Sequence, residues 1–362
     1  RYPQATEDLL KRVNQGALML SYVGHGGELG WAHERVLEVP HINQFTNKNK
    51  LPLWITATCE FTRFDDPSRV SAGEYVFLNP DGGGIGLLTT TRLVYSTPNF
   101  DLAREFNKVA YKKTANGKFP RIGDLNRITK VNAGSSINNR CFSLIGDPAL
   151  KLAYPKMNVI ASEVPDTMRA LDKITISGYV ADYSNTIIPN YNGIVYPTVY
   201  AQMKSISTLN NDGDGVFGYG QQKDVIFKGK ASARNGSFEF SFVVPKDIDL
   251  EFGTGKVSFY SDNAEFDANG VYESHQIGGV SANAPDDNTG PNINLFLNDE
   301  NFVSGGLTDN EPMLFAKLFD EHGINTVGNG VGQSMSFERA NGQGFTLIGP
   351  VSKIESGLNH AA

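Results

Sequence analysis

The chain of 362 residues is long enough for two or three domains, each with its own hydrophobic core. Its 39 acidic residues outnumber its 32 basic ones, and the net charge of −7 argues against a nucleic acid as the main partner. Two cysteines, Cys59 and Cys141, are too few for a scaffold built on disulfides, although they could form one bridge. Cys141 is interpreted as structural. No apolar run approaches the roughly 20 residues that a membrane-spanning helix requires.

Residues 1–154 alternate helical patterns with short apolar runs. A first helix is predicted between an N-cap at Thr6 and a stop at Gly16. Pro67 and Pro98, each preceded by an N-cap residue, indicate the start of two further helices. Buried strands are predicted for the apolar runs at residues 17–23, 51–57 and 85–91. Strands that alternate with helices indicate a layered α/β domain.

The composition changes near Pro155, where helical patterns fade and Gly, Asn, Thr and aromatic residues become more frequent. Strands are predicted at residues 173–180, 237–244 and 255–260, and the second of these alternates cleanly between apolar and polar side chains. Several short strands separated by turns favour a β-sandwich over residues 155–285.

A linker and a further β domain are predicted for the remainder of the chain. Residues 284–291 have the composition of a linker. Strand-like runs at residues 292–297 and 313–319 then begin another β domain over residues 286–362, which we expect to be incomplete.

Two of the apolar runs end in residues that could carry out chemistry together. Gly-His-Gly-Gly-Glu at residues 24–28 follows the first run, and Thr58 and Cys59 follow the second. In open α/β sheets, sites lie outside the carboxyl ends of the strands. If the two strands are neighbours, His25 and Cys59 can reach the same substrate bond. A cysteine attacks as its thiolate, and a nearby histidine takes or donates the proton.

The same segments supply further groups for such a reaction. The backbone N–H groups of Gly26 and Cys59 are candidates to stabilise an oxyanion, and the glycines around His25 allow a substrate to approach the backbone. Glu28 and Trp31 are predicted to shape either the substrate cleft or only the packing of the loop. The alternative for Cys59 is a buried structural cysteine, and the alternative for His25 is a histidine in a turn.

The sequence gives little reason to expect a metal. Asn-Asp-Gly-Asp-Gly at residues 211–215 resembles part of a calcium loop, which makes Asp212 and Asp214 weak calcium candidates. The segment lacks the other ligands of an EF-hand, so a hairpin turn is the favoured interpretation. The spacing of His33 and His41 matches no standard zinc pattern. We therefore predict that no cofactor is required, with a structural calcium ion as the alternative.

The two motifs resemble those of gingipain-type cysteine peptidases, family C25 of clan CD. That clan carries one hydrophobic run ending in His-Gly and a second ending in a small residue and Cys, in the order found here. Trp31 and Gly-Asp-Pro at residues 146–148 are also similar to the family, whereas Thr58 stands where many gingipains have alanine. Residues at four places resemble one branch of the family more narrowly. That branch serves the bacterial type IX secretion system as signal peptidase and sortase, and the similar segments are residues 64–67, 72–80, 84–92 and 319–325.

The resemblance implies a fold and an activity. The fold would be the C-terminal half of a caspase/gingipain-like α/β catalytic domain, followed by immunoglobulin-like β-sandwich domains. The activity would be that of a cysteine endopeptidase and transpeptidase, which removes the C-terminal signal domain of exported cargo through an acyl-enzyme at Cys59. His25 would act as acid and base, and the cargo would be joined to anionic lipopolysaccharide.

The resemblance also implies a location and partners. The protein would act on the extracellular face of the outer membrane, at the cell surface. Its partners would include an outer-membrane β-barrel anchor protein of the PorV type. The third catalytic acid of the family lies upstream of the histidine strand, so it would come from an N-terminal remainder of the same chain.

Two other functions remain open. One is a secreted, gingipain-like general protease, against which the sortase-like segments count. The other is a catalytically silent cell-surface binding protein, against which the intact His25 and Cys59 pair counts.

The end of the chain departs from the family pattern. Gln333 and Ser334 stand where a His-Asp pair is expected, and residues 333–362 resemble nothing in the family.

Overall fold

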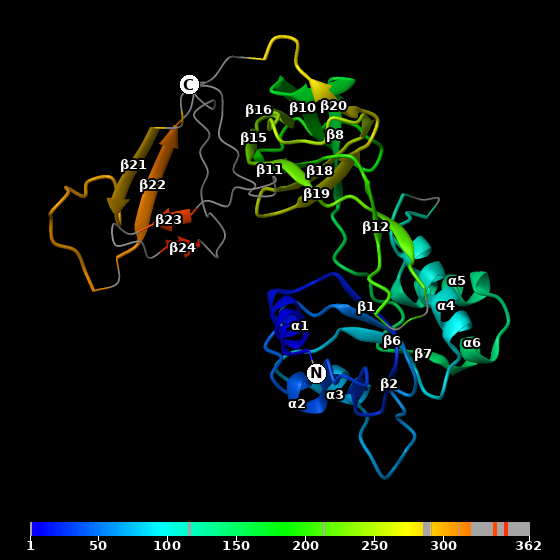
Figure 1. Cartoon of the computed structure of the whole chain (residues 1–362). Coiled ribbons are helices and arrows are strands. Elements are labelled where there is room, and N and C mark those ends of the chain that lie inside the picture. Colours follow the sequence, from blue (N-terminus) through cyan, green and yellow to red (C-terminus); the bar gives the residue numbers. More distant parts are fainter. Residues whose placement is uncertain are drawn as a thin grey trace. The chain divides into compact units, whose positions relative to one another are not determined.

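The computed structural model of the chain describes residues 2–114, 117–211, 213, 215–284, 290, 292–310, 312–319, 336–338 and 344–346. The chain divides into two compact units, Arg1–Tyr154 and Pro155–Ala362 (Figure 1). The first unit combines helices with a central sheet. The described part of the second unit contains strands and no helix.

A four-stranded sheet organises the first unit. Its strands, in the order β1-β5-β6-β7, are β1 (Met19–Val23), β5 (Leu53–Ala57), β6 (Gly86–Thr90) and β7 (Phe142–Ile145). The first three strands run parallel, and β7 runs antiparallel to β6. Every residue of β5 and β6 is buried, as the continuous apolar runs predict. The sheet is therefore mixed, with an antiparallel edge strand that the sequence pattern did not predict.

Six helices belong to the described part of this unit. They are α1 (Pro3–Gln15), α2 (Val39–Ile42), α3 (Ala72–Leu78), α4 (Ser96–Ala110), α5 (Ile122–Asn132) and α6 (Ile137–Cys141). Gly16 ends α1 as predicted, with a φ of 96° and an N–H group that bonds to the Arg12 and Val13 carbonyls. The predicted N-cap at Thr6 is wrong, because the helix already begins at Pro3. The Thr6 hydroxyl instead donates to the Val36 carbonyl at 3.0 Å.

The helix predicted to start at Pro67 begins five residues later. Ser71 and Glu74 form a capping box that fixes the start of α3 at Ala72. Asp66 does not cap a helix, because its carboxylate accepts hydrogen bonds from the N–H and hydroxyl of Ser68. These bonds lower the pKa of Asp66 and close a turn.

Alternate residues of β5 pack on opposite faces of the sheet. Leu53 and Ile55 join a core with residues of α4 and α5, whereas Trp54 joins a second core with Trp31 and Phe61. Both faces of the sheet are thus covered, which leaves the strand ends as the places where side chains can reach solvent.

The second unit is built from one large sheet and several small ones. The eight-stranded sheet runs β14-β11-β18-β19-β8-β10-β16, with β15 paired to β11. Its strands are β8 (Met157–Glu163), β10 (Lys173–Ala181), β11 (Gly193–Tyr200), β14 (Val225–Lys228), β15 (Ala231–Ala233), β16 (Ser237–Val243), β18 (Lys256–Asp262) and β19 (Asp267–Tyr272). The smaller sheets contain β9 (Thr167–Ala170), β12 (Lys204–Ser207), β13 (Gly218–Gln221), β17 (Gly253–Thr254) and β20 (Gln276–Val280).

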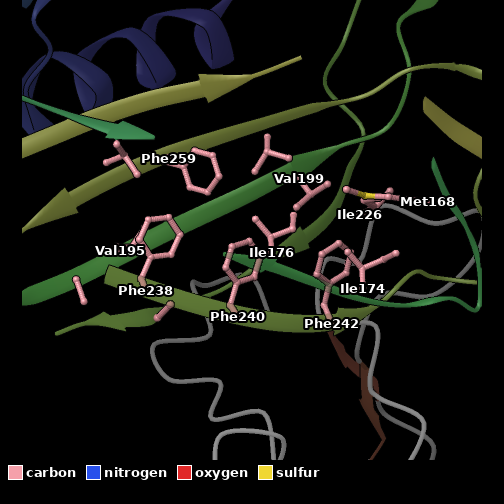
Figure 2. Packing of buried hydrophobic residues seen from close by; sticks show 14 of the residues in the cluster. Met168, Ile174, Ile176, Val195, Val199, Ile226, Phe238, Phe240, Phe242 and Phe259 are labelled. Atoms are coloured by element: carbon pink, nitrogen blue, oxygen red, sulfur yellow. The ribbon is translucent and has the colours of Figure 1, made fainter. Parts of the chain in front are cut away.

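Alternation along the strands builds the core of this unit. Phe238, Phe240 and Phe242 of β16 are buried, and the residues between them are exposed or half-buried, as the period-two pattern predicts. The ring of Phe259 from β18 lies 5.7 Å from that of Phe238 and 6.4 Å from that of Phe240 (Figure 2). Aromatic packing of this kind adds to the hydrophobic stabilisation of the unit.

Two hairpins follow near the end of the described residues. β21 (Asn292–Leu297) pairs with β22 (Leu314–Phe319), and β23 (Ser336–Glu338) pairs with β24 (Gly344–Thr346). Residues 285–289, most of the predicted linker, lie outside the described residues, as does most of the segment from residue 320 onward. Among the helices that the structure describes, none is long and apolar enough to cross a membrane.

Candidate active site

His25 and Cys59 lie at equivalent positions beyond two paired strands. β1 and β5 are parallel neighbours, and their register ends with Val23 opposite Ala57. The Gly24 N–H group continues the ladder by donating to the Ala57 carbonyl at 3.2 Å. Each candidate residue is therefore the second one after the last registered pair, at the carboxyl edge of the sheet.

The backbone of His25 is held by two hydrogen bonds. Its carbonyl oxygen accepts from the Tyr22 hydroxyl at 2.6 Å and from the Ala32 N–H group at 2.8 Å. Burial raises the pKa of Tyr22, and the Glu34 carboxylate adds to that effect, so the phenol stays protonated as a donor. The His25 ring stacks on the His33 ring with centroids 5.2 Å apart.

Gly26 lies against the strand end that carries Cys59. A Cβ atom at Gly26 would lie 2.5 Å from the Thr58 hydroxyl and 2.8 Å from the Gly30 carbonyl, so only glycine fits. Gly26 faces Trp31 across the hairpin of β2 (Gly26–Gly27) and β3 (Gly30–Trp31). In the preceding pair of the hairpin, the Ala32 N–H group bonds to the His25 carbonyl. Hydrogen-bonded and non-hydrogen-bonded pairs alternate in an antiparallel ladder, so Gly26 and Trp31 form a pair without backbone hydrogen bonds between them. The Gly26 N–H group is therefore not used by this ladder.

Cys59 is half-buried and its thiol is free. Its sulfur lies 3.6 Å from the Val94 carbonyl oxygen, and no hydrogen bond joins it to His25 among the described residues. Glu60, the next residue, adopts a φ of 48° and donates its N–H group to the Arg92 carbonyl at 3.2 Å. This left-handed residue turns the chain sharply just after the cysteine. Cys141 is also free and half-buried, so the two cysteines form no bridge.

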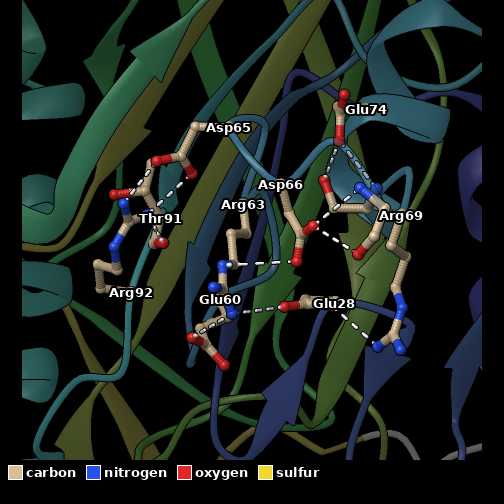
Figure 3. A network of polar contacts seen from close by, with 11 residues as sticks. Glu28, Glu60, Arg63, Asp65, Asp66, Arg69, Glu74, Thr91 and Arg92 are labelled. Atoms are coloured by element: carbon tan, nitrogen blue, oxygen red, sulfur yellow. Dashed lines mark hydrogen bonds and ion pairs between the residues drawn. The ribbon is translucent and has the colours of Figure 1, made fainter.

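Charged side chains surround the segment that follows Cys59 (Figure 3). Glu28 contacts Arg63 at 3.0 Å and Arg69 at 2.9 Å. Asp65 forms a bidentate pair with Arg92, whose guanidinium lowers the pKa of that carboxyl.

The remaining predicted site residues fall into different environments. Trp31 is only 3% exposed, and its ring stacks on Tyr22 with centroids 4.3 Å apart, so it packs in the core and does not line a cleft. Glu28 is held in ion pairs within its own unit. Asp212 and Asp214, the calcium candidates, lie outside the described residues. Among the described residues, no group of three or more His, Cys, Asp or Glu is arranged to hold a metal ion.

Sequence reasoning missed three residues that shape this site. Tyr22 and His33 contact the candidate histidine directly, and the carbonyl of Val94 faces the cysteine. His33 was considered from the sequence only as a metal ligand, and the signal for its position beside His25 is the glycine pair at 27 and 30, which allows the tight hairpin that returns the chain.

Comparison with known proteins relates this unit to one family. Residues 1–153 match the model of peptidase family C25. The match covers nearly the whole of the first unit, so this unit is similar in sequence to the peptidase domains of that family, and its central sheet is mixed.

The chain is also similar to solved structures from Porphyromonas gingivalis. Dimeric latent PorU shares 29% identity over 74% of this chain and 27% of its own, with a TM-score of 0.44. The complex of RgpB pro- and mature domains shares 16% identity over 73% of this chain and 57% of its own, with a TM-score of 0.38. The chain thus spans less than two thirds of either relative. No curated protein matches it.

Proposed function

We propose that the protein is a cysteine endopeptidase and transpeptidase, the sortase of a type IX secretion system. The observation that carries the catalytic part is the register of β1 and β5, which brings His25 and Cys59 to equivalent positions on adjacent strands. The sortase-like segments at residues 64–67, 72–80 and 84–92 support the narrower assignment.

The reaction would proceed through a thioester. The Cys59 thiolate attacks the carbonyl carbon of the scissile peptide bond, and the tetrahedral oxyanion accepts hydrogen bonds from the N–H groups of Gly26 and Cys59. His25 donates a proton to the leaving amine as the C–N bond breaks. An amine of the acceptor, or water, then attacks the thioester and passes its proton to His25. This releases the Cys59 sulfur.

The partners and location follow from the same proposal. The substrate is exported cargo with a C-terminal signal domain, and the acceptor is anionic lipopolysaccharide at the cell surface. An outer-membrane anchor protein of the PorV type holds the enzyme there, and an upstream part of the same protein supplies the third catalytic acid. Residues 155–285 are proposed to form an immunoglobulin-like sandwich, supported by the alternating strands and aromatic core. The proposed mechanism uses no cofactor.

A cysteine substitution in the complete protein tests the proposal. In cells that carry Cys59→Ala, we expect cargo that keeps its signal domain and is not attached to lipopolysaccharide, as read by the mass of the cargo. Cys141→Ala is the matched control, because it removes the other free thiol and should leave processing intact.

The possible outcomes separate the three functions. Normal processing and attachment in Cys59→Ala cells would refute the sortase. Normal attachment together with lost cleavage of unrelated proteins would favour the general protease. No effect of Cys59→Ala on either reaction would favour the silent binding protein.

A further inference from the structure

Glu28 occupies the tip of the hairpin that follows His25. Gly27 pairs with Gly30, so Glu28 and Leu29 form a two-residue tip. The two side chains have different surroundings, because Leu29 is 56% exposed and the Glu28 side chain only 12%. A carboxylate withdrawn from water to this extent requires charged or hydrogen-bonding partners.

Those partners come from the segment after Cys59. An Arg63 Nη1 atom donates to Oε1 of Glu28 at 3.0 Å, and an Arg69 Nη1 atom donates to Oε2 at 2.9 Å. Each carboxylate oxygen thus has its own cation. The carbonyl oxygen of Glu28 also accepts the N–H group of Ala72, the first residue of α3, at 2.6 Å. The hairpin tip is therefore tied to this segment at three points, of which Figure 3 shows the two contacts of Glu28 with Arg63 and Arg69.

Arg63 extends the connection to the residue beside the nucleophile. Its Nη1 atom also lies 3.5 Å from Oε1 of Glu60, which directly follows Cys59. The chain between β5 and α3 contains no helix or strand, so its course depends on individual contacts: these ion pairs, and the N–H groups of Glu60 and Thr62, which bond to the Arg92 and Thr90 carbonyls. Charged contacts thus run from the hairpin beside His25, through Glu28 and Arg63, to the loop that carries Cys59.

We propose that Glu28 is a positioning residue that fixes the loop of His25 relative to the loop of Cys59. This inference rests on the proposed peptidase function of the same site. Glu28 touches neither substrate nor reacting atoms in this arrangement, because both of its oxygens are engaged by arginines. A misplacement of about 1 Å between reacting groups lowers a rate by about 100-fold, so a loosened connection should be visible in turnover.

The first test measures how fast Cys59 reacts, without any substrate. Full-length protein is treated with iodoacetamide, and the peptides that carry Cys59 and Cys141 are quantified by mass spectrometry. Glu28→Gln keeps the shape of the side chain and removes its charge. We expect it to change the alkylation rate of Cys59 about 10-fold, because the reactivity of a thiol depends on its surroundings and the loop that carries Cys59 loses a charged connection. Cys141, in the same molecule, should react at an unchanged rate.

Glu105 provides a matched control elsewhere in the unit. Its side chain is 14% exposed and also contacts two cations, Lys108 at 2.6 Å and Arg104 at 3.6 Å. Glu105→Gln should therefore remove a similar number of ion pairs without changing the alkylation rate of Cys59. Equal Cys59 alkylation rates in Glu28→Gln and Glu105→Gln would overturn the inference.

Steady-state kinetics supply a second test. Glu28→Gln should lower kcat about 10- to 100-fold with KM within about twofold of wild type, because positioning acts on the reacting groups and not on substrate affinity. Arg63→Ala should have a similar effect, and the double variant should be no worse than the more damaging single variant. If the losses of kcat in the two single variants add fully in the double variant, Glu28 and Arg63 do not act through one shared contact.

The two proposals fail in different ways. If Cys59→Ala keeps full activity, the proposed function is wrong, and the alkylation comparison still decides whether Glu28 positions the loops. If Cys59→Ala abolishes activity and Glu28→Gln matches Glu105→Gln in both tests, the proposed function stands and only the role of Glu28 is rejected.

Discussion

The two units bury their strands in different ways. In the first unit, β5 and β6 are buried at every position, and polar Thr56 and Thr89 lie inside. In the second unit, β16 buries alternate residues, and its three phenylalanines join a cluster of apolar and aromatic side chains, although the unit also buries Ser261 and His275. A sheet covered on both faces can present chemistry only beyond its strand ends, and both candidate residues of the first unit lie there. The buried face of β16 contributes packing alone. This contrast predicts which substitutions affect stability and which affect activity.

The largest expected effect lies in the core of the second unit. Phe240→Ala should lower the free energy of unfolding of this unit by about 3–5 kcal/mol, because it opens a cavity between Phe242 and Phe259. Denaturant unfolding measures the loss. Glu239→Ala, at the exposed neighbouring position, should change stability by no more than about 0.5 kcal/mol. Equal losses would contradict the assignment of the inward face.

The next effect lies at the strand end of the first unit. Gly26→Ala places a methyl group against the Thr58 hydroxyl and should lower kcat/KM about 100-fold by displacing His25. Gly27→Ala is the matched control, because a Cβ atom there meets nothing within 4 Å. Peptidase assays on the complete protein would compare them. Similar activities of the two variants would show that the close approach at Gly26 is not needed.

A third substitution removes a polar group from the covered sheet. The Thr89 hydroxyl bonds to Thr56 at 2.7 Å and to Thr62 at 2.9 Å, and all three residues are buried. Thr89→Val should cost about 1–3 kcal/mol, because it leaves two buried hydroxyls with one partner fewer. Thr175→Val is the control, because it removes an exposed hydrogen bond to Ser241. It should lower the free energy of unfolding by less than about 0.5 kcal/mol, and denaturant unfolding measures both variants.

The smallest predicted effect is a pH dependence of the second unit. His275 is fully buried, neither ring nitrogen has a partner among the described residues, and burial lowers its pKa. The unfolded chain therefore binds a proton that the folded chain excludes. Stability should be complete above the ordinary pKa of about 6.5 and should fall below it by up to about 1.4 kcal/mol per pH unit. Unfolding midpoints between about pH 7.5 and about pH 5 measure this, and His275→Phe should flatten the curve.

The sequence predicted the buried strands and the candidate pair for the same physical reason. Continuous apolar runs identify strands covered on both faces, and parallel strands bring their carboxyl ends together. The register itself could not be predicted, because apolarity at every position of β5 leaves its alignment with β1 open. The alternating pattern of residues 237–244 was more informative, since it also gave the inward face of β16.

Contacts between distant segments were beyond sequence reasoning. Trp31 was considered for the cleft, yet its ring lies in the core between Tyr22 and Trp54. Glu28 meets Arg63 and Arg69 only because the hairpin turns it toward a segment far along the chain. The start of α3 was misplaced because Asp-Pro and the Ser71 capping box compete as helix signals, and the capping box also gains two side-chain bonds.

The fixed register between β1 and β5 limits where the chain can accept inserted or deleted residues. One codon inserted within residues 19–25 or 53–59 would rotate one candidate residue to the other face of the sheet, so such insertions should be absent from active variants. The connection between the two strands is exposed at residues 48–50, where an insertion would disturb the local backbone bonds of Lys48 and Lys50 but would shift neither registered strand. Tags or reporter peptides are therefore best placed there.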